Sequence, residues 1–146
     1  MKKYLAVFAV AFALAGACIG FAQSAEQETK TRPATFATSD QVKYNEVVPG
    51  VTRAVLWGNP DKGRYGAFTK FKPGMDAGMH THTNDVWLVV IKGAYLYKDD
   101  AGEKRVGPGN FIRIPAKHKH WSGGDAKEGA LFYEESSGKF DLIPAK

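Results

Sequence analysis

The sequence predicts an all-β, antiparallel protein of the sandwich or jelly-roll type. From Val42 onward, short apolar or alternating runs are separated by segments rich in Gly, Pro, Asn and Asp. Eight of these runs fit strands, and the chain shows no long amphipathic helical pattern. Many short strands at this spacing are typical of an antiparallel sandwich or a closed barrel.

The predicted strands span residues 52–57, 65–71, 86–91, 94–98, 111–114, 118–121, 130–134 and 140–143. Residues 58–61, 72–74, 99–102 and 122–125 predict turns, because they combine glycine, proline, asparagine and aspartate. The strand at 86–91 is apolar on both faces, with Val86, Leu88 and Val90 alternating with Trp87, Val89 and Ile91. We therefore expect a cover on both sides, and a homodimer could supply the outer one.

Residues 1–24 have the features of a secretory signal peptide. Two lysines follow Met1, residues 4–22 are uncharged, and small residues surround a cleavage position near Ser24. We expect a periplasmic or secreted protein with no stable membrane association after cleavage. Two alternatives stay open: the 19-residue run could be an uncleaved anchor, or Cys18 could carry a lipid, since residues 14–18 resemble a lipoprotein signal with one residue too many.

The remaining chain predicts a single domain. Its 146 residues divide into the leader, a polar flexible arm at 25–41 and a folded domain at 42–146. Cys18 is the only cysteine, so the mature protein could form no disulfide and must be stabilised by its core. The formal net charge is +5, but the Lys and Arg residues do not cluster on one element. This distribution argues against nucleic acid as a partner.

The four histidines lie in two short segments. His80 and His82 are two residues apart, so in an extended chain both side chains point to the same side. His120 lies in a strand-like segment downstream, and the three imidazoles together suit a divalent metal such as Zn, Cu, Fe or Ni. His118 could be a further ligand or a solvated histidine at the rim.

Two motifs in this order resemble those of the cupin superfamily. The first motif is matched by Gly74, His80, His82 and Gly93, and the second by Pro115 and His120, with Lys117 where glycine is usual. Over residues 65–134 the chain is similar to a small, single-domain, ChrR-like cupin. The resemblance implies a conical jelly-roll β-barrel, or double-stranded β-helix, in which His80, His82 and His120 hold a divalent ion, such as Fe(II), Zn, Ni, Cu or Mn, near the mouth.

One departure from the motif bears on the ligand set. The glutamate that the family places in the first motif falls at Val86, which cannot bind a metal. Asp85 has the opposite strand parity and could reach the ion only through a bulge or an irregular turn. Three imidazoles with open coordination positions are a catalytic rather than a structural arrangement.

Several other side chains have two interpretations. Either Glu134 or Glu135 could support a ligand imidazole, although solvation at a strand end is the simpler expectation. Arg113 either needs an acidic partner or an anionic ligand, or faces water at an edge strand. The aromatic residues Tyr95, Tyr97, Phe111, Trp121 and Tyr133 could line a pocket or belong to the core.

Three classes of function compete, and the fold alone does not decide among them. The first is a metal-dependent enzyme, for which three-histidine cupins suggest a dioxygenase or related oxidoreductase acting on a small molecule. The second is a module that binds a small-molecule ligand or a metal without turnover. The third is a stable cupin whose site has decayed, as Val86 and Lys117 would allow.

Overall fold

The short apolar runs form eleven strands in the part of the chain that the structure describes. This computed structural model describes residues 33–146, so the predicted leader and residues 25–32 of the predicted arm lie outside it. The strands are β1 (Asn45–Val48), β2 (Val51–Gly58), β3 (Tyr65–Phe71), β4 (Asp76–Thr81), β5 (Val86–Gly93), β6 (Tyr95–Asp99), β7 (Gly102–Val106), β8 (Phe111–Ile114), β9 (His120–Gly124), β10 (Ala130–Ser136) and β11 (Ile143–Pro144).

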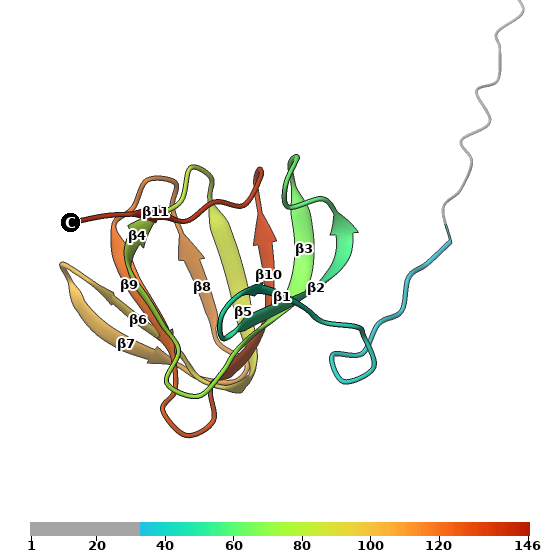
Figure 1. The fold of residues 1–146 in the computed structure, drawn as a ribbon, viewed down its shortest axis with the longest axis horizontal. Coiled ribbons are helices and arrows are strands. Elements are labelled where there is room, and N and C mark those ends of the chain that lie inside the picture. The colour runs from blue at the N-terminus through green and yellow to red at the C-terminus, as the bar shows by residue number, and fades with distance from the viewer. Residues whose placement is uncertain (1–32) are drawn as a thin grey trace, which may run out of the picture. The chain divides into compact units, whose positions relative to one another are not determined.

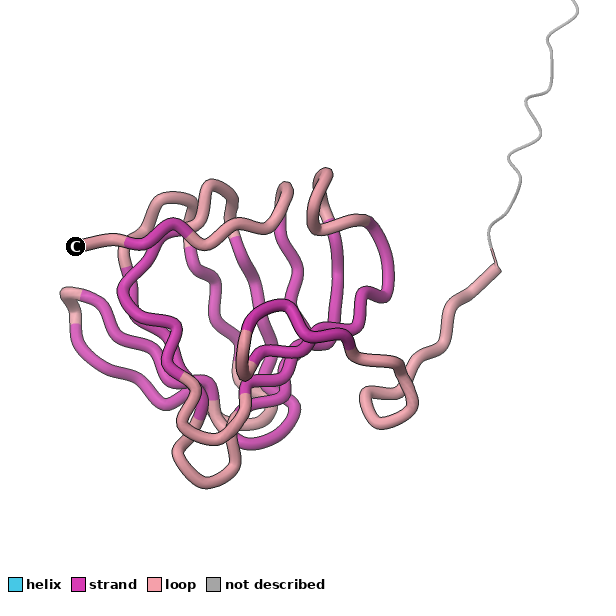
Figure 2. The backbone as a smooth tube through the Cα atoms, viewed as in Figure 1, coloured by secondary structure: helices cyan, strands magenta, loops and turns pink. Residues whose placement is uncertain are grey.

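The strands form two antiparallel sheets, as predicted. The larger sheet has the order β1-β2-β3-β10-β5-β8, and the smaller one has the order β11-β4-β9-β6-β7. The two sheets face each other in the folded unit that begins at Thr35, and short loops join the strands at both ends (Figures 1 and 2). The predicted all-β jelly-roll class is confirmed. No helix long and apolar enough to cross a membrane occurs among residues 33–146.

Alternation along the strands separates the core from the outer surface. In β5, Val86, Leu88 and Val90 are at most 5% exposed, whereas Val89 and Ile91 are 38% and 40% exposed. The inward side chains join a core cluster with Tyr95, Tyr97, Val106, Ile114, Ala130 and Phe132, which both sheets contribute. The chain itself therefore covers one face of β5, and the homodimer that would cover the other face stays a prediction.

The predicted turn at 122–125 is wrong in position, because Ser122 to Gly124 belong to β9. A Cβ atom on Gly123 would lie 2.7 Å from the carbonyl oxygen of Met75, and one on Gly124 would lie 2.8 Å from that of Lys72. These glycines mark a close approach of two backbones rather than a reversal of the chain. The turn follows instead at Asp125, whose backbone pairs with Gly129.

Three strands were not predicted, and two others differ in extent. β1, β4 and β7 were absent from the predicted set, because their residues are largely polar or exposed and give no strong apolar alternation. The predicted strand at 140–143 shrinks to β11, and the strand predicted at 118–121 begins only at His120. His118 lies in the preceding turn, where its backbone N–H donates to the carbonyl oxygen of Pro115.

The backbone at Gly93 explains why the first motif has glycine at this position. It adopts a φ of 68°, and a Cβ atom there would collide with the carbonyl oxygen of Gly129. Only glycine avoids both the left-handed penalty and the collision. Gly93 therefore allows β5 to end against the turn that precedes β10.

Candidate metal centre

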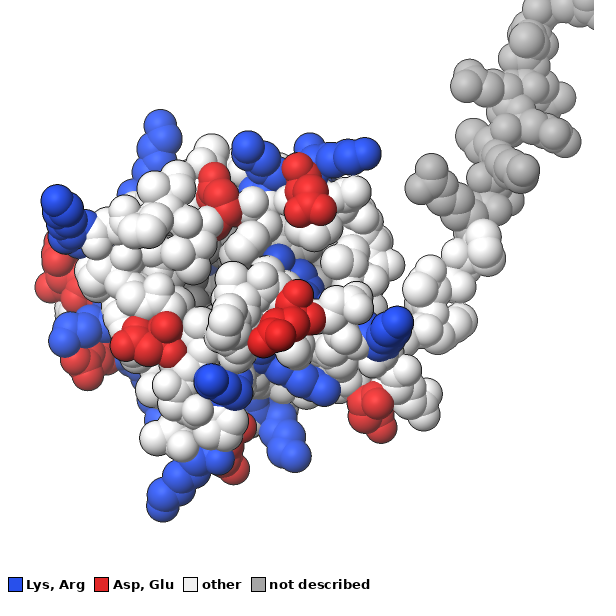
Figure 3. Space-filling view, viewed as in Figure 1, with Lys and Arg blue, Asp and Glu red and all other residues white. Residues whose placement is uncertain are grey.

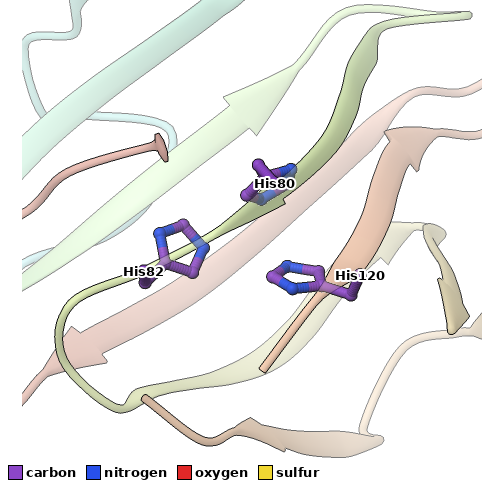
Figure 4. Close-up of side chains that lie close together, drawn as sticks. All are labelled: His80, His82 and His120. Carbon is purple, nitrogen blue, oxygen red and sulfur yellow. The ribbon is translucent and has the colours of Figure 1, made fainter. Parts of the chain in front are cut away.

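Two neighbouring strands of the smaller sheet bring three histidines together. His80 in β4 pairs directly with His120 at the start of β9, and His82 follows the end of β4. The ring centroids of His80 and His120 are 4.2 Å apart, and those of His80 and His82 are 4.9 Å apart. Figure 4 shows the three rings facing a common point. The side chains are 2%, 7% and 0% exposed for His80, His82 and His120.

Backbone carbonyl groups fix the tautomer of each ring. The Nδ1 atom of His80 lies 2.8 Å from the carbonyl oxygen of Gly78, and that of His120 lies 3.0 Å from the carbonyl oxygen of His118. The Nδ1 atom of His82 lies 2.6 Å from the carbonyl oxygen of Asp141. Since a carbonyl oxygen only accepts, each Nδ1 carries the hydrogen, and each Nε2 keeps a free lone pair.

The free ring nitrogens meet the requirements of a metal site. One ligand nitrogen from each ring lies within 4.8 Å of the others. Among residues 33–146, the Nε2 atom of His120 is the one buried side-chain polar atom without a hydrogen-bond partner. Such an orphaned buried acceptor is costly unless something binds it. A carbonyl group behind each ring is also the arrangement that orients metal-binding histidines, so the three residues fit a divalent ion.

Burial keeps the three rings neutral. It lowers the pKa of His80 and of His82, and it lowers the pKa of His120 to about 4. The hydrogen bonds to the carbonyl groups act in the opposite direction but do not overcome the loss of hydration. At neutral pH the three imidazoles are therefore uncharged, which is the form that binds a metal.

The C-terminal segment completes the site. The backbone of Asp141 accepts from His82, and its side-chain Oδ1 accepts the backbone N–H of Thr83 at 2.8 Å. Next to it, β11 pairs with the His80 end of β4. The ring of Phe140 packs at a centroid distance of 5.9 Å from His82. This segment therefore holds the orientation of one candidate ligand from outside the two histidine motifs.

Val86 and Asp85 lie as the strand parity predicts. Val86 is 5% exposed and lines the same cavity as His80 and His82, so an apolar side chain stands on the cavity wall there. Asp85 instead accepts from the guanidinium of Arg113 at 2.6 Å and from the backbone N–H of Ala116 at 2.7 Å. Asp85 is not in the candidate ligand group, and Arg113 both pairs with it and faces water, since its side chain is 56% exposed on the edge strand β8.

Replacing Asp85 by asparagine will reduce stability at neutral pH and not at acid pH. The Ala116 N–H and the Arg113 guanidinium hold the pKa of Asp85 below its ordinary value. A carboxylate with a lowered pKa stabilises the fold above its unfolded-state pKa, and this stabilisation is lost as pH falls through the folded-state value. Urea midpoints of the two proteins should differ at pH 7, and the difference should shrink as the pH falls below about 4. A difference that does not change with pH would contradict the assignment.

His118 does not join the histidine group. Its Nε2 lies 3.0 Å from Oδ2 of Asp99, and its side chain is 41% exposed. Asp99 also accepts from the Tyr97 hydroxyl at 2.8 Å, and the Tyr97 ring stacks on His120 at 5.5 Å. Of the two interpretations of His118, the structure therefore agrees with a histidine at the rim rather than a further metal ligand. Together with Tyr97 and Asp99, it packs behind His120.

The backbone conformation at Lys117 explains why glycine is usual at this position of the second motif. Lys117 has a φ of 62°, and it is the single non-glycine residue with positive φ among residues 33–146. Its N–H donates to the carbonyl oxygen of His82 at 2.7 Å, which ties the two motifs together. The bond is made in this left-handed backbone conformation, which lysine adopts at a cost of roughly 1–2 kcal/mol.

Replacing Lys117 by glycine will therefore stabilise the domain. Relief of the left-handed strain outweighs the greater freedom of glycine in the unfolded chain, which costs about 0.4–1 kcal/mol. A net gain of about 0.5–1 kcal/mol corresponds to a rise in Tm of about 2–4 °C. Lys117→Ala is the matched control, since it removes the same charge but keeps the Cβ atom. Equal Tm values for the two variants would refute the strain.

A cavity of about 380 Å³ opens beside the histidines. Its wall is mostly apolar, with Val51, Val86, Leu88, Phe132 and Leu142 among the lining residues. In the space-filling view, the centre of the face is hollowed, and blue atoms lie within the hollow (Figure 3). A cavity of this size and character suits a small organic molecule.

A buried ion pair lines the cavity, and sequence reasoning missed it. The Nε atom of Arg53 lies 2.7 Å from Oε1 of Glu134, and both side chains are 6% exposed. The expectation that Glu134 is solvated at a strand end is therefore wrong. Glu134 shares inward parity with Ala130 and Phe132, and Arg53 shares it with Val51. That parity was the available signal.

Hydroxyl groups complete the environment of Glu134. Its Oε1 accepts from the Thr69 hydroxyl at 3.0 Å and from the Tyr65 hydroxyl at 3.3 Å. Burial and the nearby negative charge raise the pKa of Tyr65, so its hydroxyl remains a donor. Glu134 makes no hydrogen bond to a histidine ring within residues 33–146, and Glu135 accepts from Tyr133 instead. Neither carboxylate supports a candidate ligand directly.

Of the aromatic residues with two interpretations, Tyr95 alone lines this cavity. Tyr97 belongs to the core cluster, and Trp121 lines a separate hollow along the smaller sheet. Phe111 is 62% exposed, and Tyr133 pairs across the outer side of the larger sheet with Trp57, whose Nε1 donates to the Tyr133 hydroxyl at 3.0 Å. The wall of the cavity is therefore built mainly from aliphatic side chains and Phe rings.

Three inward-facing histidines beside a cavity between two antiparallel sheets define a cupin-type protein. The sequence also matches the family model of the ChrR cupin-like domain over residues 32–135. The chain therefore belongs to this family. A search of curated proteins finds no match.

Solved structures share the fold at low identity. KdgF from Halomonas sp. is 22% identical, with a TM-score of 0.58, over 70% of this chain and 94% of that chain. The polyketide cyclase RemF from Streptomyces resistomycificus is 18% identical, with a TM-score of 0.64, over 78% of this chain and 87% of that one. The Rhodobacter sphaeroides complex of SigE with the anti-sigma ChrR is 16% identical, with a TM-score of 0.55, over 68% and 50%. These similarities extend to the fold alone.

Proposed function

We propose that this protein is an exported, metal-dependent cupin enzyme, an oxidoreductase of the dioxygenase type that acts on a small molecule. His80, His82 and His120 would hold the divalent ion through their Nε2 atoms. The observation that carries the proposal is the unpartnered, buried Nε2 of His120, which lies close to the rings of His80 and His82. Export rests on the leader predicted at residues 1–24.

The ligand set shapes the chemistry that the site can support. A divalent ion held by three neutral imidazoles is a Lewis acid, and it keeps coordination positions open for a substrate and dioxygen. Val86 on the cavity wall offers no carboxylate to neutralise the charge. The site therefore favours an anionic ligand more than a site with two histidines and one carboxylate would.

The chain itself contributes binding and the exclusion of water. The apolar wall removes a small molecule from solvent, and the carbonyl groups of Gly78, His118 and Asp141 hold the rings in one orientation. Preorganised groups of this kind reduce the reorganisation that a reaction requires. Buried neutral rings also remain available as ligands throughout the neutral pH range.

Metal analysis followed by turnover tests the proposal. The mature protein, loaded separately with Fe(II), Zn, Ni, Cu and Mn under argon, should retain close to one ion per chain, and His82→Ala should lose it. Oxygen uptake by the Fe(II) form is then measured with β-diketones, thiols and phenols. A preparation that holds no ion above background, whether or not His82 is present, would leave a decayed site.

A second candidate function is a binding module without turnover. The deep apolar cavity beside the histidines favours it equally well, since such a cavity suits binding as much as catalysis. A metal-loaded protein that gains thermal stability from a ligand, yet leaves it chemically unchanged in the presence of dioxygen, would establish this function. Detection of a product would exclude it. Neither candidate involves nucleic acid.

A further inference from the structure

The guanidinium of Arg53 is buried but incompletely bonded. Its Nε atom contacts Oε1 of Glu134 at 2.7 Å and Oγ1 of Thr69 at 3.3 Å. No hydrogen bond joins Nη1 or Nη2 to any residue of 33–146, although the side chain is only 6% exposed. Neither atom is among the fully enclosed unpartnered ones, so both retain access to the cavity that Arg53 lines. Four N–H donors thus have no hydrogen-bond partner within residues 33–146, on a side chain that lines the cavity.

Neighbouring groups hold this guanidinium in place. Its central carbon lies 4.1 Å from the centroid of the Phe140 ring and 5.3 Å from that of Tyr65. Phe140 also packs against His82, so one aromatic ring separates the arginine from the candidate metal ligand. Stacking and the Nε contacts leave the planar fork preorganised for a two-oxygen partner.

A divalent ion held by the histidines would make the charge around the cavity favour an anion. Arg53 is the sole lysine or arginine among the lining residues, and Glu134 balances it. The other lining acid, Asp76, accepts from Trp121 at 2.6 Å and from the Gly78 N–H at 2.8 Å. Imidazoles bind a metal in their neutral form, so a divalent ion would change the summed charge of the lining residues from −1 to +1. An anionic group between the ion and Arg53 would offset this positive charge.

The geometry points to a substrate class, and we propose that Arg53 binds the carboxylate of a small, mainly apolar acid. In this arrangement Nη1 and Nη2 donate to the two carboxylate oxygens, and the hydrocarbon part lies against Val51, Leu88 and Phe132. Bidentate pairing with a carboxylate is the contact for which the guanidinium is best shaped. This inference rests on the proposed function for the role of the acid as substrate, but acid binding itself can be measured without the metal.

Phenylacetate and its neutral isostere phenylacetamide test the inference by calorimetry. The full-length chain should bind phenylacetate at least tenfold more tightly than phenylacetamide, both with and without Zn²⁺. Arg53→Lys keeps a positive charge beside Glu134 but loses the fork, so it should erase this preference while leaving the Zn²⁺ affinity unchanged. Arg113→Lys is the matched control, because that arginine also pairs with a carboxylate but is exposed. It should leave both affinities unchanged.

A double variant keeps the test valid if Arg53→Lys folds poorly. Arg53→Met with Glu134→Gln removes the buried charges together, and it should fold, by circular dichroism, yet show no preference for the acid. Equal affinities of the wild type for the acid and the amide, or no saturable binding of phenylacetate, would overturn the inference. A wild-type protein that prefers phenylacetate to phenylacetamide but binds no Zn²⁺ would instead refute the proposed function and leave this inference standing.

Discussion

Replacing His120 by alanine will weaken Zn²⁺ binding by at least about 100-fold, because residues that only orient metal ligands already account for about 10- to 100-fold. His120 is fully buried, and its Nε2 has no other partner within the described residues. Its removal leaves two nitrogens, which cannot close a three-coordinate site. Competition with a chromophoric chelator measures the affinity, and circular dichroism without metal checks the fold.

His118→Ala is the matched control for this experiment. It removes an imidazole from the same short segment, but one that pairs with Asp99 rather than with the other rings. The carbonyl group of residue 118 that orients His120 belongs to the backbone and is retained. The Zn²⁺ affinity of His118→Ala should stay within a few-fold of the wild type. Equal losses in both variants would show that the assignment of the ligand set is wrong.

Replacing Glu134 by leucine will destabilise the domain by about 3–5 kcal/mol, since it leaves a buried guanidinium without its counter-charge. Both members of the Arg53–Glu134 pair are 6% exposed, and Tyr65 and Thr69 would lose an acceptor as well. Chemical unfolding measures the loss. A further change of Arg53 to methionine should recover most of it, because a pair of apolar side chains can replace a buried ion pair with little penalty.

An exposed pair of the same length provides the comparison. Lys98 and Glu103 lie 2.6 Å apart, but their side chains are 56% and 70% exposed. Glu103→Leu should cost less than about 1 kcal/mol, because water screens the pair and solvates the remaining lysine. If Glu103→Leu and Glu134→Leu cost the same, burial would not be the cause of the effect.

The features predicted correctly from the sequence depend on local spacing. His80 and His82 are two residues apart with Thr81 between them, so an extended backbone alone turns both side chains to the same face. The cupin motifs then placed His120 with them, and the same parity rule correctly placed Val86 on the cavity side and Asp85 away from it. These inferences require only a strand and its period of two.

The features that were missed depend on contacts between distant parts of the chain. Arg53 meets Glu134 only because β2 and β10 both pair with β3, with Thr69 opposite Arg53 in β2 and Phe132 in β10. No local sequence pattern predicts the register of these three strands. Gly123 was likewise predicted to lie in a turn. The reason for glycine at this position is the backbone of Met75, which lies in a distant segment of the sequence. Long-range register was therefore the missing information.

The dependence of His82 on Asp141 determines the order in which the centre can be assembled. The carbonyl group that orients this ring comes from almost the last part of the described chain, and β11 must pair with β4 beside it. A nascent chain still lacking this segment has the three imidazoles but not their final arrangement. Because this segment follows all three histidines in the chain, the ring of His82 takes its final orientation only when the last part of the domain has folded.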